Sequence, residues 1–106
     1  MSDQIRASHI LLMFAGSSRS TATRTKEEAI EQIAGIKTEL DAGGDFAEAA
    51  SKHSDCPSSS SGGDLGEFSR GMMVPEFDEV VFDLEVGATS GVVETPFGYH
   101  IIQRTG

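Results

Sequence analysis

Three side chains of this sequence have the chemistry for acid–base, nucleophilic or metal-binding work: His9, Cys56 and His100. A histidine changes charge near neutral pH, and a thiol becomes a nucleophile when a neighbouring base activates it. A metal site built from all three is disfavoured, because their spacings match no compact zinc signature. Spacing alone is more typical of two core histidines whose ring nitrogens are satisfied locally.

Cys56 has two interpretations that the residues leave open. Asp55 precedes it, and a neighbouring carboxylate raises the pKa of a thiol unless a cation offsets the charge. An inert loop thiol and a reactive thiol are therefore both compatible with the sequence. The serines and glycines that follow, at 58–63, predict an exposed loop because they bury no apolar surface.

Two predicted strands position the histidines. Residues 5–12 form a short apolar run that suits a strand buried on both faces, and alternation puts His9 and Leu11 on the same face. Residues 99–103 are also strand-like and carry His100. If the two strands are neighbours, the two imidazoles meet across the sheet in fixed tautomers, because two buried positive charges are unfavourable.

The rest of the chain predicts helices and turns around these strands. The expected elements are a flexible loop over 14–25, a helix that starts with a capping box at 25–28 and stops at 43–44, a shorter helix capped by Asp45, a strand over 64–68, a helix with Pro75 in its first turn, and a hairpin turn at 95–98. This order predicts one α+β domain over residues 1–106, with a small and largely antiparallel sheet.

Four apolar residues near the predicted turns are of interest: Leu65, Met73, Phe77 and Phe97. Methionine and aromatic residues at such positions usually belong to a core. The functional alternative is a shallow apolar cup on the surface of the domain.

The composition limits the partners and the compartment. The formal charge of −9 at pH 7 repels nucleic acid and anionic lipid at long range, so neither is expected as a partner. One cysteine excludes an internal disulfide and suits a reducing compartment. No secretory signal or membrane-length apolar run is visible, and we therefore expect a cytoplasmic protein.

Six motifs in a fixed order are far more specific together than any one of them alone. They are Ala7-Ser8-His9-Ile10-Leu11, Asp45-Phe46-Ala47, Ser54-Asp55-Cys56-Pro57-Ser58, Gly62-Gly63-Asp64-Leu65-Gly66-Glu67-Phe68, Gly71-Met72-Met73-Val74-Pro75-Glu76-Phe77 and Phe97-Gly98-Tyr99-His100-Ile101-Ile102. Over essentially the whole chain they resemble the parvulin family of peptidyl-prolyl cis/trans isomerases. Residues 23–29 and 102–105 are also similar to the Pin-type, phosphorylation-directed branch.

The resemblance implies the FKBP-like α+β fold, in which helices surround a four-stranded, mostly antiparallel sheet in the order βα3βαβ2. It also implies roles for individual residues. His9 and His100 match the paired histidines of the family, and Thr95 matches a hydroxyl hydrogen-bonded to that pair. Cys56 matches a position that is Cys or Asp across parvulins, so we interpret it as an electrostatic element and not as an attacking thiolate. The pocket for the proline ring corresponds to Leu65, Met73 and Phe77.

The family needs no cofactor or metal, and its partners are proline-containing peptides and unfolded polypeptides. Pin-type enzymes bind phosphate with a basic cluster in the loop after the first strand. Here that loop is shorter, begins with Met13, and has only Arg19 near the expected arginine pair, while Arg24 lies close to the helix start. We therefore expect a monomeric isomerase that prefers apolar residues before proline and tolerates phosphate without requiring it.

Two rival functions are also compatible with the sequence. One is a binding module or chaperone that holds proline-containing segments without useful turnover, and the other is a thiol redox protein that uses Cys56. A phosphoSer/Thr-Pro-directed isomerase is the alternative within the family.

Overall fold

The computed structural model describes residues 4–17, 22–55 and 57–106. Its elements in chain order are β1 (Ile5–Leu12), α1 (Lys26–Asp41), α2 (Phe46–His53), the 3-10 helix η1 (Pro57–Ser61), β2 (Asp64–Phe68), α3 (Pro75–Asp83), β3 (Val93–Thr95) and β4 (Gly98–Arg104). Among the described helices, none combines the length and the hydropathy that crossing a bilayer requires.

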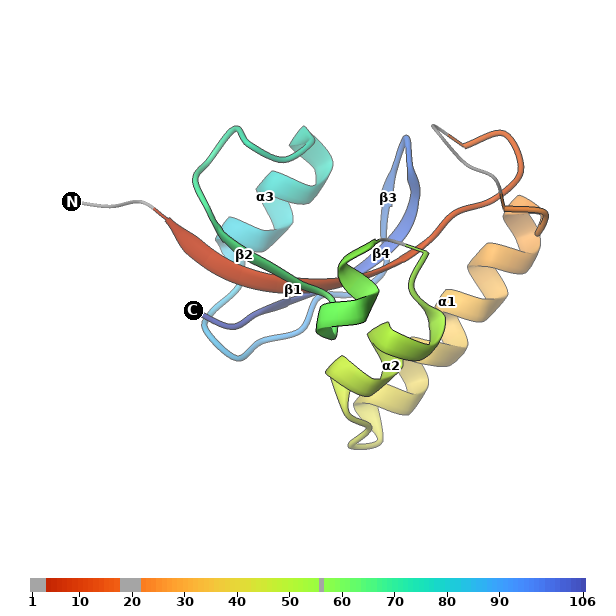
Figure 1. Ribbon diagram of the computed structural model, residues 1–106, viewed down its shortest axis with the longest axis horizontal. Coiled ribbons are helices and arrows are strands. Elements are labelled where there is room, and N and C mark those ends of the chain that lie inside the picture. The colour runs from red at the N-terminus through yellow and green to blue at the C-terminus, as the bar shows by residue number, and fades with distance from the viewer. Residues whose placement is uncertain (1–3, 18–21, 56) are drawn as a thin grey trace.

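The four strands form one sheet in the order β2-β1-β4-β3, and every neighbouring pair is antiparallel. Figure 1 shows α3 on one side of this sheet and α1 with α2 on the other. The predicted α+β class with a four-stranded antiparallel sheet is confirmed. The first and last strands of the chain, β1 and β4, are neighbours at its centre, and these are the two strands that carry His9 and His100.

Local sequence signals account for most element boundaries. Thr25 is the N-cap of α1: its hydroxyl accepts a hydrogen bond from the Glu28 amide at 3.1 Å, and the Glu28 carboxylate accepts one from the Thr25 amide at 2.9 Å. This is the predicted capping box. Pro75 occupies the first turn of α3, where its missing N–H is not needed. The β3–β4 hairpin turns through two residues, 96 and 97.

The serine tract forms the 3-10 helix η1, a more regular structure than the loop that the sequence predicts. Its carbonyl oxygens accept local hydrogen bonds from the glycine amides that follow: Gly62 donates to Ser59 at 3.1 Å and Gly63 donates to Ser58 at 2.8 Å. The predicted cap of α2 is wrong in detail, because Asp45 is the N-cap residue but its side chain makes no capping hydrogen bond.

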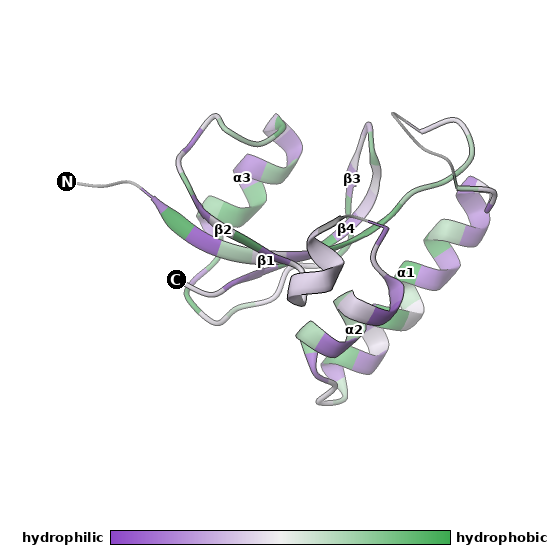
Figure 2. Cartoon of the chain, viewed as in Figure 1, coloured by the Kyte–Doolittle hydropathy of each residue, from purple (hydrophilic) through white to green (hydrophobic). Residues whose placement is uncertain are grey.

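Alternation along the central strands divides the interior into two cores. One core packs Ile10, Leu12 and Ile101 of the sheet against α1 and α2, and the other packs Ile5, Ala7 and Ile102 against α3. Figure 2 shows hydrophobic and hydrophilic bands alternating along α1, whose buried residues Ala29, Ile33 and Ile36 belong to the first core. His9 and His100 lie on the α3 face of the sheet, where both rings contact Phe77, so the candidate site borders the second core.

Candidate functional site

The two histidines form a buried pair on the α3 face of the sheet. In the β1–β4 ladder His9 is opposite Ile102 and His100 is opposite Leu11, which makes the two imidazoles diagonal neighbours. Their Nδ1 atoms lie 3.1 Å apart and their ring centroids lie 5.2 Å apart at an interplanar angle of 26°. The sequence predicted that the imidazoles meet if their strands are neighbours. The strands are neighbours, and the imidazoles do meet.

Thr95 extends the pair into a hydrogen-bonded chain. Its hydroxyl oxygen lies 2.7 Å from Nε2 of His100 and also accepts a hydrogen bond from the Phe97 amide at 3.2 Å. The arrangement that uses the hydroxyl proton has Thr95 donating to Nε2 of His100. Nδ1 of His100 then donates to Nδ1 of His9, and His9 carries its own proton on Nε2, a buried atom that has no hydrogen-bond partner among the described residues.

Burial keeps both imidazoles neutral at physiological pH. It lowers the pKa of His9 from 6.5 to about 4, since desolvation disfavours the charged ring. Burial also lowers the pKa of His100 from 6.5 to about 3, and the nearby His9 adds repulsion between the charged forms. The pair therefore acts through fixed dipoles and hydrogen bonds and not as a positive charge.

An apolar cleft of about 450 Å³ opens beside the histidines. Its lining, apart from the two imidazoles, is Leu11, Met13, Leu65, Met72, Met73, Val74, Phe77 and Phe97. Phe77 connects the cleft to the polar chain, because its ring meets each imidazole edge-on at a centroid distance of 5.6 Å. The three residues that the resemblance assigns to the proline pocket thus lie in one cavity with the histidine pair.

Phe97 was also a residue of interest in the sequence, but three other lining residues of this cleft were not predicted as site residues: Leu11, Met72 and Val74. Met72 is 65% exposed, and its apolar side chain stands at the cavity mouth. The available signal was the motif at 71–77, in which a run of apolar residues between Gly71 and Pro75 is too short for a core element.

The segment before Cys56 is fixed to the same strand as His9. The Asp55 amide donates to the Leu11 carbonyl at 2.7 Å, and the Ser54 hydroxyl accepts from the Leu11 amide at 3.0 Å. Cys56 itself and Arg19 lie outside the described residues. What the structure does show is that the residue before the cysteine is bonded to β1 two positions beyond His9.

The backbone of His9 is also bonded to the segment that follows η1. The His9 amide donates to the Gly63 carbonyl at 2.9 Å, which joins the end of η1 to β1. A Cβ at Gly63 would lie 2.4 Å from the His9 carbonyl oxygen, so glycine is required for this approach. The backbone around His9 is therefore held from the two loops that flank η1.

Arg24, a candidate for anion recognition, is already bonded within the protein. Its guanidinium forms an ion pair with Asp55 and donates to the Met13 carbonyl at 2.9 Å, while Asp55 also accepts from the Met13 amide at 2.9 Å. The candidate residues Met13 and Arg24 are thus brought together, but Arg24 is neutralised by a carboxylate. Lys26, the next cation, pairs with Glu94 at 3.4 Å.

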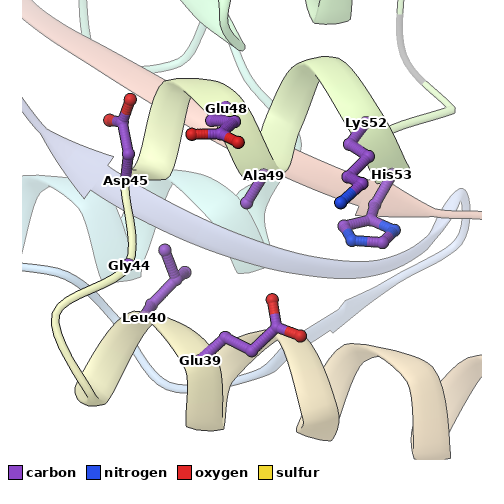
Figure 3. Close-up of a pocket in the computed structure, with 8 residues that line it drawn as sticks. All are labelled: Glu39, Leu40, Gly44, Asp45, Glu48, Ala49, Lys52 and His53. Carbon is purple, nitrogen blue, oxygen red and sulfur yellow. The ribbon is translucent and has the colours of Figure 1, made fainter.

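A second cavity, of about 150 Å³, lies between α1 and α2 and has a different character. Figure 3 shows Glu39 of α1 facing Glu48, Lys52 and His53 of α2 across it. It contains neither of the paired histidines. Within residues 4–17, 22–55 and 57–106, no group of three histidine, cysteine, aspartate or glutamate side chains could hold a metal ion. The apolar cleft beside the histidine pair is the better candidate site.

Comparisons with known proteins show the family and the fold of this chain. A family model described as the PPIC-type PPIase (peptidyl-prolyl isomerase) domain matches residues 1–106. The peptidyl-prolyl cis-trans isomerase Pin1 of Arabidopsis thaliana is 42% identical over 114 residues, covering 97% of this chain and 96% of that protein. The solution structure of TbPIN1 is 42% identical, with a TM-score of 0.90 and full coverage of both chains.

A second solved structure, peptidyl-prolyl isomerase ESS1 from Candida albicans, also has a TM-score of 0.90. It is 38% identical and matches 98% of this chain, which spans 63% of that one. The two structural matches confirm the parvulin architecture that the six motifs predicted.

Proposed function

The chain belongs to the PPIC-type peptidyl-prolyl cis-trans isomerase family. From this we propose a mechanism by which its cleft accelerates rotation about Xaa-Pro bonds, and a class of polypeptide substrates. It is an enzyme of the isomerase class. The proposed substrates are flexible or unfolded proline-containing chains, whose folding the enzyme assists without a strict need for phosphorylation. One observation carries the mechanism: a buried histidine pair, with Nδ1 atoms 3.1 Å apart, lines an apolar cavity.

The physical task is modest compared with covalent chemistry. Rotation about an Xaa-Pro bond faces a barrier of roughly 18–20 kcal/mol, because amide resonance is lost when the bond twists. Uncatalysed, the rotation takes tens to hundreds of seconds. Bringing it to milliseconds requires a reduction of roughly 5–7 kcal/mol, at about 1.36 kcal/mol for each tenfold. No bond to the enzyme has to form.

The apolar side of the cleft supports the first part of this mechanism. We propose that Leu65, Met73 and Phe77 hold the proline ring while the preceding carbonyl rotates. A planar amide is more polar than a twisted one, because resonance separates its charge. An apolar cavity therefore stabilises the twisted bond relative to the planar bond, and closure over the ring excludes water.

The polar side supports the second part. We propose that His9, His100 and Thr95 form a preorganised hydrogen-bond chain beside the rotating amide, whose fixed dipoles need no rearrangement during rotation. A neutral pair suits this role because a charged imidazole would stabilise the polar, planar amide. Cys56 is proposed as a further electrostatic and hydrogen-bonding member, on the family resemblance alone.

The proposed specificity rests on the neutralised Arg24 and on the apolar lining of the cleft. The Asp55 carboxylate neutralises Arg24, and the cleft lining includes the apolar Met13 and Met72. Methionines are flexible and polarisable, so they accommodate apolar side chains of different shapes. We therefore propose a preference for an apolar residue before proline, with phosphate or carboxylate tolerated.

A panel of Xaa-Pro peptides tests activity and specificity in one assay. Peptides with Leu-Pro, Glu-Pro and phosphoSer-Pro are compared by protease-coupled isomerisation, and we expect the highest kcat/KM for Leu-Pro. A preference for phosphoSer-Pro of about a hundredfold or more, roughly 2.7 kcal/mol, contradicts the specificity and favours a phosphorylation-directed enzyme. Peptide binding without acceleration favours the rival binding module.

Three further expectations belong to this proposal. The chain is expected to be a monomer, to assist folding of unfolded polypeptides, and to work in the cytoplasm. Sedimentation of the purified chain, refolding of a proline-limited client and cell fractionation test them in turn.

A further inference from the structure

β2 contains an irregularity next to the proline pocket. Its pairs with β1 are Ile5↔Phe68, Arg6↔Glu67 and Ser8↔Asp64, with a shift of register between the last two. Between those pairs β1 has only Ala7, while β2 has both Leu65 and Gly66. This two-against-one arrangement is a β-bulge, which inserts one extra residue and changes the direction of the strand.

The bulge decides which face of the sheet Leu65 occupies. Phe68 shares its face with its partner Ile5, and both belong to the core under α3. In a regular strand, alternation back from Phe68 would put Leu65 on the opposite face, away from α3. The extra residue reverses this, and Leu65 packs against the same core as Phe68 and lines the cleft.

Glycine and aspartate hold the bulge in place. Gly66 has a φ of +74°, a backbone conformation that most side chains disfavour, and a Cβ at this position would meet no atom within 4 Å. The requirement for glycine is therefore conformational and not steric. The Gly66 amide donates to a carboxylate oxygen of Asp64 at 3.0 Å, and the Arg6 guanidinium donates to both oxygens of that carboxylate at 3.3 and 2.6 Å.

We infer that Gly66 and Asp64 are positioning residues of the isomerase: together they maintain the bulge that presents Leu65 to the proline ring. Arg6 supports Asp64 from the exposed side. This inference rests on the proposed function, because it requires that the ring enters the cleft that Leu65 lines.

Three glycine variants separate positioning from stability. Gly66→Ala disfavours the bulge, and Gly66→Asn adds a Cβ but tolerates positive φ better. Gly87→Ala is the matched control, since Gly87 has a φ of +89°, an open surrounding and no place in the cleft. We expect Gly66→Ala to raise KM for a Leu-Pro peptide about fivefold or more, with a smaller effect on kcat.

The controls decide the interpretation. Gly87→Ala should lower the melting temperature as much as Gly66→Ala does while leaving KM unchanged, and Gly66→Asn should restore most of the lost affinity. An unchanged KM in Gly66→Ala overturns the inference. So does a Gly66→Asn variant as impaired as Gly66→Ala, because the effect would then come from the added side chain and not from the backbone.

Substitution of Asp64 tests the same inference without changing Gly66. Asp64→Ala removes the acceptor of the Gly66 amide and should raise KM in the same direction, whereas Arg6→Gln leaves that hydrogen bond intact and should have a smaller effect. Equal effects of the two variants would assign the role to the ion pair and contradict the inference.

Failure of the proposed function gives a different result. If the unsubstituted chain does not accelerate isomerisation, the proposed function is wrong. The positioning of Leu65 is then decided by NMR without substrate. Contacts of the Leu65 methyl groups with the ring of Phe77 or the methyl of Met73 should be lost in Gly66→Ala and retained in Gly66→Asn. Their persistence in Gly66→Ala also overturns the inference.

Discussion

His9 and His100 face each other across β1 and β4 through their Nδ1 atoms, 3.1 Å apart, so that one proton lies between the two rings. Two protons in that position would repel, and none would leave two acceptors in contact. The position of this proton sets the tautomer of both rings, and Thr95 fixes it from the other end of the chain.

The protein should lose stability as the pH falls below about 6.5, the pKa of histidine in an unfolded chain. The lowered folded-state pKa values, about 4 for His9 and about 3 for His100, mean that the unfolded state binds more protons in this range. The free energy of unfolding should therefore fall by about 1.4 kcal/mol per pH unit for each histidine until the folded-state pKa is reached.

Urea unfolding between pH 8 and pH 4 measures this slope, and His53→Gln is the control because His53 is not part of the pair. Isomerase activity should be level from about pH 6 upward, since both rings are neutral there. Nitrogen-15 spectra that show a charged His9 or His100 ring at pH 6 contradict the prediction.

Thr95→Val should impair catalysis although valine and threonine have nearly the same size. The substitution preserves the shape of a buried side chain but leaves Nε2 of His100 without its partner, at a cost of about 1–3 kcal/mol in stability. We also expect kcat to fall about tenfold, because the tautomers are no longer fixed. Thr95→Ser should retain both.

Thr89→Val is the matched control, since Thr89 pairs only loosely with Gln103 at 3.5 Å and lies outside the cleft. Equal kcat values for Thr95→Val and Thr89→Val would show that the hydroxyl beside His100 has no catalytic consequence.

Asp55→Asn should shift specificity toward acidic substrates. The change retains an oxygen for the Met13 amide but removes the charge that neutralises Arg24. We expect the ratio of kcat/KM for phosphoSer-Pro to that for Leu-Pro to rise about three- to tenfold, at about 1.4 kcal/mol per tenfold.

Asp41→Asn makes the same change in net charge at the remote Lys37–Asp41 pair and should leave the ratio unchanged. If both variants raise the ratio equally, the effect comes from net charge and not from Arg24.

Cys56→Asp should retain substantial isomerase activity, because an electrostatic and hydrogen-bonding role does not need a nucleophile. Initial rates on the Leu-Pro peptide measure it, with Cys56→Ala as the variant that lacks either polar group. Complete loss of activity in Cys56→Asp, together with a trapped adduct of the Cys56 sulfur on the substrate carbonyl carbon in which the bond to proline is intact, would establish covalent catalysis instead.

Much of the architecture can be predicted from the sequence, because the signals for helix starts and turns are local. The capping box at Thr25, the proline at the start of α3 and the two-residue hairpin turn each specify an element boundary through interactions within a few residues. Alternation also assigns His9 and His100 to a face of their strands. It does not say which strands are neighbours, and the family motifs supplied that step.

The features that sequence reasoning missed are non-local. Arg24 is 31 residues from Asp55, and nothing in the sequence spacing indicates that their ion pair neutralises a candidate anion site. The bulge in β2 depends on the register against β1, which a strand pattern alone leaves undetermined. Met72 lines the cleft from the segment between β2 and α3, and a residue in a turn has no periodic signal.

The neutral lining of the cleft has a consequence for encounter rates. None of the described side chains that line it carries a formal charge at neutral pH, although the chain as a whole carries −9. Capture of an uncharged proline segment should therefore proceed at nearly the same rate in low and high salt. A client rich in lysine or arginine should be drawn to the molecule by its overall field, and its association should slow as salt screens that field. The net charge would then select which clients arrive, while the cleft selects which bond is turned.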